Sequence, residues 1–159
     1  MMRRTAGFSL IELMVVIVIT VILLTLAVPS FVELMARQRV QGVANELSAD
    51  LQYTRSLAVT NRVDAQLQVS SSTQYNITSP PGGTSFKSIT LGTDTTLDPA
   101  SATLVFESRL GSMTNSADIA LTVANSRTSA TLRVTVGPTG RVQICAPGGI
   151  FPGYRTCAS

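Results

Sequence analysis

An apolar run of 21 residues, Phe8–Val28, constrains this chain more than any other feature of its sequence. At about 1.5 Å per helical residue, the run would form a helix roughly 32 Å long, which matches the ~30 Å hydrocarbon core of a bilayer. Arg3 and Arg4 are the only charged side chains before it. Basic residues hold the flanking end of a membrane helix in the cytoplasm. We therefore expect one membrane-spanning segment, with the rest of the chain exported.

Glu12 is the one charged side chain inside this run. A charge at bilayer depth costs roughly 2.5–3.5 kcal/mol, so we expect this carboxylate to have a function and a partner. A secretory signal peptide carries small residues after its apolar core, whereas here the small residue Gly7 precedes the core. If the chain were cut after Gly7, the new amine on Phe8 would lie one helical turn from Glu12. The Phe8 amine of a neighbouring chain could pair with the carboxylate of Glu12 equally well.

The segment Arg3–Leu13, with the sequence RRTAGFSLIEL, resembles the leader and cleavage site of type IV pilins and their pseudopilin relatives. The resemblance implies that residues 1–7 are a leader peptide, that a prepilin peptidase cuts between Gly7 and Phe8, and that the amine of Phe8 is then methylated. It also implies that Glu12 mediates subunit–subunit assembly. The alternative is an unprocessed single-span anchor whose Glu12 snorkels to the membrane surface.

Beyond Pro29 the apolar residues recur every three or four positions, which predicts an amphipathic helix with one buried face. The predicted stripe comprises Ala36, Val40, Val43, Leu47, Leu51, Thr54 and Ala58. We expect one helix from Phe8 to about Thr60, of which residues 8–29 form the membrane or filament-core half. Two helices hinged at Pro29 are the alternative, because proline removes a backbone donor.

The run Leu47–Val59, with the sequence LSADLQYTRSLAV, is similar to the end of the long helix in the GspH/FimT group of minor pilins and pseudopilins. This resemblance implies the type IV pilin fold. From the residues alone, Asp50 and Arg55 are interpreted as a solvated face, and Leu51 and Ala58 as core.

After the helix the period of apolar residues changes to two, which predicts half-buried strands. The predicted strands are Arg62–Ser70, Gln74–Thr78, Phe86–Leu91, Thr103–Glu107, Ile119–Val123, Thr131–Val136 and Arg141–Cys145. Together they indicate an α+β domain formed by residues 30–159, in which the long helix packs on an antiparallel sheet.

The last two predicted strands form a hairpin whose register follows from parity. Residues paired in an antiparallel ladder share a face, so their numbers must sum to an even value if both apolar sets face the core. The apolar sets are Leu132, Val134 and Val136 on one strand and Val142 and Ile144 on the other. The turn beginning at Gly137 therefore needs three or five residues, or a bulge. Arg133, Arg141 and Gln143 are then expected on the outer face.

Cys145 and Cys157 are the only cysteines. In the oxidising compartment that the topology implies, we expect them to form a disulfide. The loop that they would close is rich in Pro and Gly and too irregular to hold itself in one conformation.

The sequence offers little support for an enzymatic function. The chain has no His, which excludes Ser–His and Cys–His dyads and an imidazole metal site. Asp94 and Asp98 flank a Thr-rich loop, but too few acidic ligands surround them for calcium, so we expect a solvated loop. We therefore expect no catalysis, cofactor, metal or small-molecule substrate.

Charge is distributed unevenly along the chain. From Arg109 onward there are five arginines and one acid, Asp118, a side-chain charge of +4, whereas the rest of the chain beyond Gly7 carries −3. Such asymmetry is typical of a phosphate-binding surface. The candidate DNA-binding residues are Arg133, Arg141, Gln143 and Arg155. FimT-type receptors carry a Gly-Arg-x-Arg motif near this end, and here Gln143 replaces the second Arg. The alternative is an arginine-bearing sheet face that only keeps the domain soluble.

Three functions fit these features. The first is a minor type IV pilin, at or near the tip of a pilus, that primes assembly and supports adhesion, twitching motility or DNA uptake. The second is a minor pseudopilin of a type II secretion system, and the third is a DNA receptor for natural transformation. The expected partners are other pilins, the prepilin peptidase, the inner membrane and, for the third function, DNA. The expected location is the bacterial inner membrane, with the C-terminus in the periplasm, and then the extracellular pilus.

Overall fold

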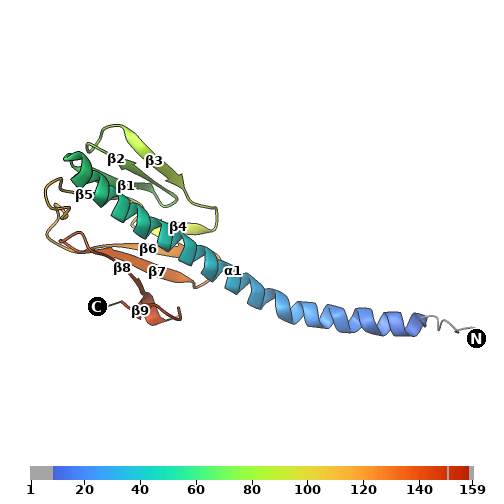
Figure 1. Cartoon of the computed structure of the whole chain (residues 1–159). Helices are drawn as coiled ribbons and strands as arrows, with labels where there is room; N and C mark the ends of the chain where they lie inside the picture. The colour runs from blue at the N-terminus through green and yellow to red at the C-terminus, as the bar shows by residue number, and fades with distance from the viewer. Residues whose placement is uncertain (1–8, 150, 158–159) are drawn as a thin grey trace, which may run out of the picture. The chain divides into compact units, whose positions relative to one another are not determined.

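The computed structural model of the chain describes residues 9–149 and 151–157. One long helix, α1 (Leu10–Asn61), precedes a series of short strands (Figure 1). The strands are β1 (Ala65–Ser71), β2 (Gln74–Thr78), β3 (Ser85–Thr90), β4 (Thr95–Asp98), β5 (Ala102–Phe106), β6 (Ile119–Asn125), β7 (Thr131–Val136), β8 (Val142–Ala146) and β9 (Arg155–Thr156). A short 3-10 turn, Pro147–Gly149, separates β8 from β9.

The helix α1 is continuous across Pro29. The expected single helix is therefore confirmed from Leu10 to Asn61, and the alternative of two separate helices is wrong. The chain nevertheless forms two compact units, the first ending at Met35 and the second comprising Ala36–Ser159. The helix contributes residues to both, and each unit is described by itself below.

In the second unit, α1 buries the face that the sequence pattern predicts. Ala36, Val40, Leu47, Leu51, Thr54 and Ala58 are buried, together with Ala44, and Val43 is half-buried. This spacing of three and four residues places them on one side of the helix. The buried face packs into a single hydrophobic core that also receives side chains from both sheets, among them Leu67, Tyr75, Phe106 and Leu132.

The strands form two sheets, whereas the sequence predicted an antiparallel sheet under the helix without dividing it. One sheet has the order β3-β2-β1-β5 and the other the order β4-β6-β7-β8-β9. Every pairing is antiparallel except that of β8 with β9, which is parallel. In Figure 1 the C-terminal half of α1 lies across these sheets. The expected α+β fold with a long helix on antiparallel strands is therefore confirmed.

The hairpin between β7 and β8 has the register that parity requires. Val134 pairs with Ile144 and Val136 pairs with Val142, so five residues, 137–141, form the turn. The N–H of Gly137 donates to the carbonyl of Arg141 (3.0 Å) and closes it. Leu132, Val134 and Val136 are buried, so the predicted core face is confirmed, and of the predicted turns the structure has the one of five residues.

Candidate functional site

The first unit presents an apolar surface that no described residue covers. Every described hydrophobic side chain from Leu10 to Met35 is at least 37% exposed. Monomeric soluble proteins rarely expose contiguous apolar patches larger than a few hundred Å². Among the described residues, α1 is the one helix long and apolar enough to cross a membrane. A surface of this kind is stable only where lipid or another protein covers it.

Glu12 is the one charged side chain of this apolar stretch, and it differs from the threonines of the stretch in its hydrogen bonding within the described residues. The hydroxyl of Thr20 donates to the carbonyl of Val16, and that of Thr25 donates to the carbonyl of Ile22, both at 2.7 Å. The described residues, in contrast, offer the carboxylate of Glu12 neither an ion pair nor a hydrogen bond. A carboxylate in an apolar medium needs a partner, so the predicted role of Glu12 in contacts between subunits stays a prediction. The predicted cleavage and methylation residues, Gly7 and Phe8, lie outside the described residues.

In the second unit, a buried carboxylate fixes α1 to the first sheet. Asp50 is only 6% exposed. It accepts a hydrogen bond from the hydroxyl of Tyr75 on β2 (2.8 Å) and pairs with the ammonium of Lys87 on β3 (2.7 Å). Burial, with the hydrogen bond to Asp50, raises the pKa of Tyr75 well above its ordinary value. The hydrogen bond that the Lys87 ammonium donates to Asp50 raises the pKa of Lys87. The prediction that Asp50 lies on a solvated face is therefore wrong.

Arg55 is the second charged residue that the sequence analysis placed on a solvated face of the helix. Its side chain is held between two turns. Its Nε donates to the carbonyl of Gly111 (2.9 Å). A Cβ added at Gly111 would come within 2.9 Å of this Nε, and one added at Gly140 would clash with the Gly111 carbonyl oxygen. Both glycines have positive φ, +63° and +75°, which favours glycine on its own. Arg55 is therefore an anchor rather than part of a solvated face.

A third charged contact ties the helix to the second sheet. Asp94 pairs with Arg39 of α1 (3.0 Å) and with Arg127 of the loop between β6 and β7 (2.9 Å). Its side chain is 18% exposed. The expectation of a solvated loop around Asp94 and Asp98 is thus only half correct, since Asp98 is exposed on β4 and Asp94 is engaged. Among the described residues, no group of three or more His, Cys, Asp or Glu could hold a metal ion.

Cys145 and Cys157 form a disulfide, with Cα atoms 4.9 Å apart, as the sequence predicts. The loop between them carries β9 and the buried side chain of Phe151, whose ring makes an edge contact with Tyr154. The disulfide thus holds a small structure that packs on the core.

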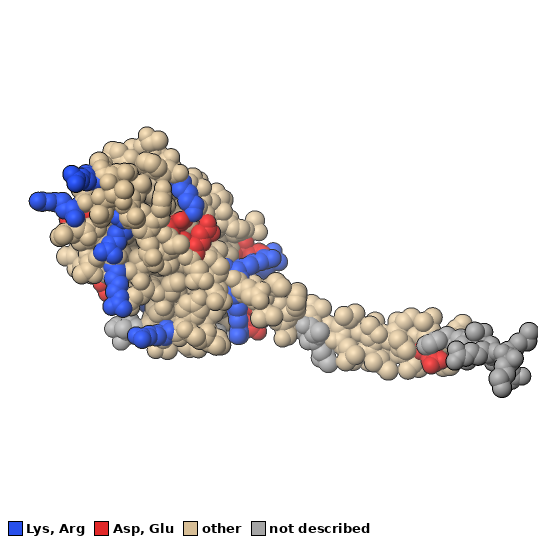
Figure 2. Space-filling view, viewed as in Figure 1, with Lys and Arg blue, Asp and Glu red and all other residues tan. Residues whose placement is uncertain are grey.

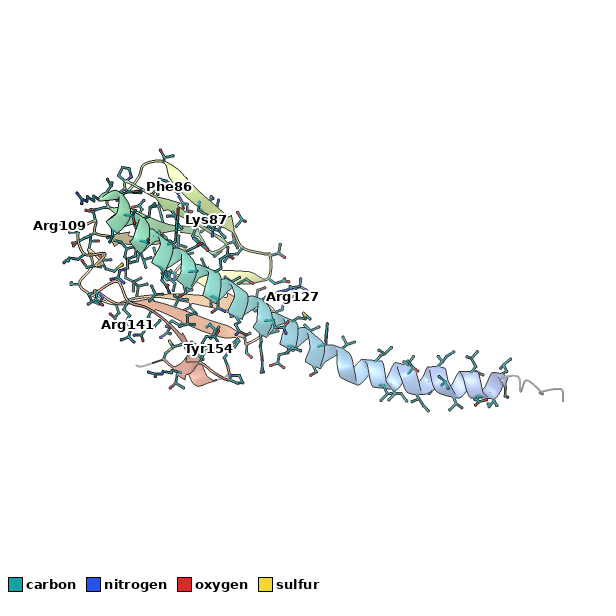
Figure 3. All side chains as sticks on the ribbon, viewed as in Figure 1. Phe86, Lys87, Arg109, Arg127, Arg141 and Tyr154 are labelled. Atoms are coloured by element: carbon teal, nitrogen blue, oxygen red, sulfur yellow. A yellow bond between two sulfur atoms is a disulfide. The ribbon has the colours of Figure 1, made fainter. Side chains whose placement is uncertain are left out.

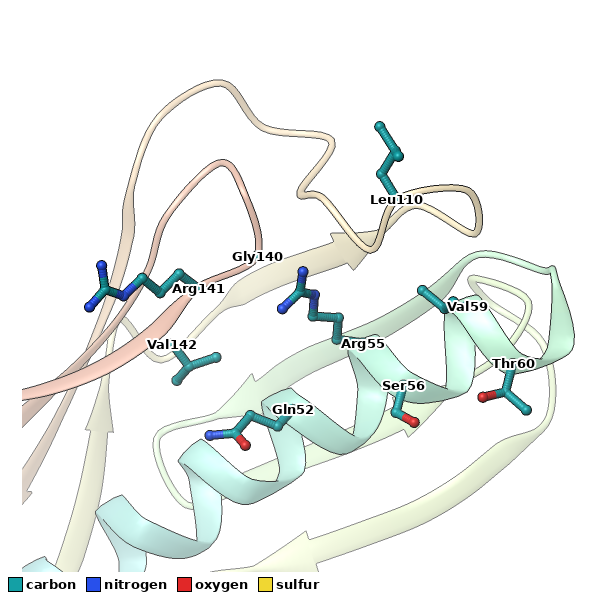
Figure 4. Close-up of a pocket in the computed structure, with 9 residues that line it drawn as sticks. All are labelled: Gln52, Arg55, Ser56, Val59, Thr60, Leu110, Gly140, Arg141 and Val142. Atoms are coloured by element: carbon teal, nitrogen blue, oxygen red, sulfur yellow. The ribbon is translucent and has the colours of Figure 1, made fainter.

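The structure brings together three of the four candidate DNA-binding residues. Arg133 of β7 pairs with Cys145 of β8, which pairs with Arg155 of β9. Since paired residues share a face, Arg133 and Arg155 lie on the same face, and Gln143, two positions from Cys145, lies there too. Arg141 instead lies in the turn before β8 and lines a pocket beside α1 (Figures 3 and 4).

Sequence reasoning missed the residues that attach α1 to the sheets. Asp50 and Arg55 were singled out, but with the wrong environment, and Tyr75 and Lys87 were not singled out at all. Lys87 is the only lysine of the chain and Tyr75 one of three tyrosines. Their rarity was the only available signal, and it does not identify their partners.

Comparisons with known proteins agree with this arrangement. The family described as "Prokaryotic N-terminal methylation motif" matches residues 2–28, and the family "Type II transport protein GspH" matches residues 43–140, more than half of the chain. Two crystal forms of the type IV minor pilin FimU from Pseudomonas aeruginosa are similar in structure, with TM-scores of 0.57 and 0.59 at 22% identity. These matches cover 72% and 74% of this chain and 98% and 96% of FimU. No curated protein sequence matches significantly.

The methylation motif, the exposed apolar helix and the pilin fold define a structural subunit of a type IV pilus or pseudopilus, one that is processed by a prepilin peptidase and joins other pilins. The chain belongs to the GspH/FimT group of minor pilins and pseudopilins. Fold and family are those of structural subunits rather than enzymes. The apolar helix suits a pilin that is anchored in the inner membrane before assembly.

Proposed function

We propose that this protein is a minor type IV pilin that joins the pilus at or near its tip and helps to start assembly. One observation carries the proposal: an apolar helix, exposed along its whole described length in unit 1, with the carboxylate of Glu12 unpaired inside it. The membrane covers the apolar side chains before assembly, and neighbouring helices cover them in the filament. The pilus then supports adhesion, twitching motility or DNA uptake.

The partner for Glu12 is the methylated amine of Phe8 on an adjacent subunit. A cut after Gly7 creates this amine, and an opposite charge in an apolar surrounding stabilises the carboxylate. Before assembly the second unit faces the periplasm, since Arg3 and Arg4 hold the leader in the cytoplasm. Afterwards it is extracellular.

A pseudopilus in type II secretion requires the same helix, and the name of the matching family points to it. The similar crystal structures, however, are those of a type IV minor pilin, which favours the pilus. Deletion of the gene separates the two systems: we expect far fewer surface pili, normal type II secretion, and recovery of pili by the wild-type gene. A secretion defect with normal pili would show instead that the protein is a pseudopilin of a type II secretion system.

DNA binding is a second candidate function, and the charges on the β7–β9 face favour it. Arg133 and Arg155 flank Cys145 in adjacent strands, with Gln143 on the same face. Among the described residues, neither arginine has an ion pair, whereas Arg127 is paired with Asp94. Two arginines on the strands that lie on either side of β8 can contact successive phosphates without reading sequence.

The test is an anisotropy titration of the full chain in detergent micelles with duplex DNA at several salt concentrations. Removing two phosphate contacts with Arg133→Ala and Arg155→Ala should weaken binding and reduce the salt slope by roughly 2. Arg127→Ala is the matched control and should change neither. Absence of binding at low salt, or binding that the double variant leaves unchanged, would remove this function.

A further inference from the structure

Two surface pockets adjoin each other at the C-terminal end of α1. The larger, of about 650 Å³, lies between α1, the loop that carries Leu110 and the β7–β8 turn (Figure 4). The smaller, of about 510 Å³, is lined by Val59, Arg62, Ser108 and Arg109. Val59 lines both pockets, so they form one continuous surface. We call it the distal basic surface and define it by Arg55, Val59, Arg62, Arg109, Leu110 and Arg141.

The distal basic surface carries four arginines, and none of them forms an ion pair within the described residues. Two carboxylates nearby in sequence accept hydrogen bonds rather than forming ion pairs with these arginines. Asp64 accepts the N–H of Ser108 (2.8 Å), and Glu107 accepts the hydroxyl of Ser112 (2.9 Å). In Figure 2 basic side chains gather on the side of the second unit where Figure 3 labels Arg109 and Arg141.

One of the four arginines is already oriented for a ligand. The Nε of Arg55 donates to the carbonyl of Gly111, which fixes the guanidinium plane, while its terminal nitrogens have no partner among the described residues. Figure 4 shows this guanidinium pointing toward the β7–β8 turn rather than into the core. An arginine fixed in this way loses little conformational entropy when it binds a carboxylate.

Exposed apolar side chains lie among these charges. Leu110 is 76% exposed and Val59 is 44% exposed. Arginine beside apolar side chains is the composition typical of protein–protein contacts. Neither pocket is lined by an aromatic side chain on which a base could stack, and a phosphate backbone would leave Leu110 in water. The chemistry therefore favours an acidic protein over a nucleic acid.

We propose that the distal basic surface docks a neighbouring pilin subunit through a segment that carries Asp or Glu side chains and one apolar side chain. The carboxylates pair with the arginines, and the apolar side chain covers Leu110 and Val59. This inference rests on the proposed assembly function. It assigns a second contact to the subunit, formed by the second unit and separate from the apolar helix with Glu12.

A photo-crosslinking amino acid at Leu110 tests the contact in cells that assemble filaments from the full chain. We expect a crosslink to another pilin subunit, mapped by mass spectrometry to a segment that contains Asp or Glu. The same group at Phe86, which is 52% exposed on β3, is the matched control and should give no such product. A crosslink to DNA, no crosslink, or the same product from Phe86 would overturn the proposal.

Charge reversal then tests the mechanism of the contact. Arg62→Glu with Arg109→Glu should lower the Leu110 crosslink at least tenfold, and reversing the acids in the mapped segment should restore it. Arg133→Glu with Arg155→Glu, which changes the charge equally on another face, should leave it intact. A crosslink insensitive to Arg62 and Arg109 would contradict the docking mode. Thermal unfolding of each variant confirms that the domain stays folded.

The amount of each variant in sheared filaments separates this inference from the function on which it rests. If the chain with the crosslinker at Leu110 enters filaments but gives no product, the docking surface is wrong and the assembly function stands. If even the wild-type chain is absent from filaments, the assembly function fails, and the docking proposal fails with it.

Discussion

The two parts of α1 have opposite environments. From Leu10 to Met35 the described hydrophobic side chains are exposed, whereas from Ala36 to Ala58 one face is buried against both sheets. Both parts are helical in the same element. Among the described residues, only the second part of the helix is covered by the domain of this chain, and we expect lipid or other subunits to cover the first part.

Two carboxylates on this helix show the same contrast. Asp50 is buried and satisfied within the chain by Tyr75 and Lys87. Glu12 lies among apolar side chains and has no partner among the described residues. A substitution at Asp50 should therefore change the stability of the domain, and a substitution at Glu12 should change assembly with other chains.

The largest effect is expected from Glu12→Gln, which keeps the shape of the side chain and removes its charge. It should insert into the membrane at least as well as the wild type, because the cost of burying a charge disappears. Its incorporation into sheared filaments should fall at least tenfold, because the pairing between subunits is lost. Glu46→Gln, at an exposed carboxylate of the second unit, is the matched control. Normal incorporation of Glu12→Gln would show that the two parts of α1 do not differ as described.

The next largest effect is expected on the free energy of unfolding, which should respond to substitutions in one part of α1 and not in the other. Leu51 is fully buried, whereas Leu24 is 56% exposed. Leu51→Ala should lower the free energy of unfolding by about 2–5 kcal/mol, since it removes buried methyl groups and leaves a cavity. Leu24→Ala should leave it within about 0.5 kcal/mol of the wild type. Chemical denaturation of both variants in detergent micelles measures the difference, and equal losses would contradict the comparison.

Loss of the disulfide should destabilise the second unit alone. Replacing Cys145 and Cys157 by Ser should cost about 3 kcal/mol, because the short loop between them is no longer restrained in the unfolded chain. Membrane insertion should not change, since the apolar helix segment contains neither residue. A domain whose unfolding free energy is unaffected by the double variant would show that the loop is held by Phe151 and its contacts instead.

The smallest effect concerns the contact between α1 and the first sheet. Tyr75→Phe should cost about 1 kcal/mol at neutral pH, because Asp50 loses one donor. The folded state raises the pKa of Tyr75 and of Lys87 above their ordinary values of 10.0 and 10.5. Their contribution to stability is therefore fully present below about pH 10 and is lost as the pH rises further.

Unfolding of Tyr75→Phe measured from pH 8 to pH 11 should consequently decline less steeply than that of the wild type. Tyr53→Phe, at a tyrosine that is 47% exposed, is the control and should follow the wild-type curve. Identical slopes for all three proteins would show that the contact contributes nothing to the pH dependence.

The sequence predicts the features that depend on local periodicity. The stripe from Ala36 to Ala58 repeats at helical spacing, and the β7–β8 register follows from the alternation of Val134, Val136 and Val142. Both were confirmed. The apolar run likewise predicts a helix long enough to cross a membrane, and the described part of α1 has that length and composition.

The remaining features depend on contacts between distant segments. The strand β4 (Thr95–Asp98) lies in a Thr-rich stretch without strong alternation, and β9 (Arg155–Thr156) is too short to show a period. The environment of Asp50 required knowledge that Lys87, 37 residues away, would face it. A polar residue on a helix gives no local signal of whether water or a buried partner will satisfy it.

The intact mass of the chain isolated from sheared filaments tests the assembly account most directly. The account predicts a filament-associated protein that begins at Phe8, carries one methyl group on its amine and contains the Cys145–Cys157 disulfide. A Gly7→Val chain, whose added side chain should block the cut, is predicted to remain uncut in the membrane. A mature N-terminus other than Phe8, or absence of the chain from filaments, would contradict the account.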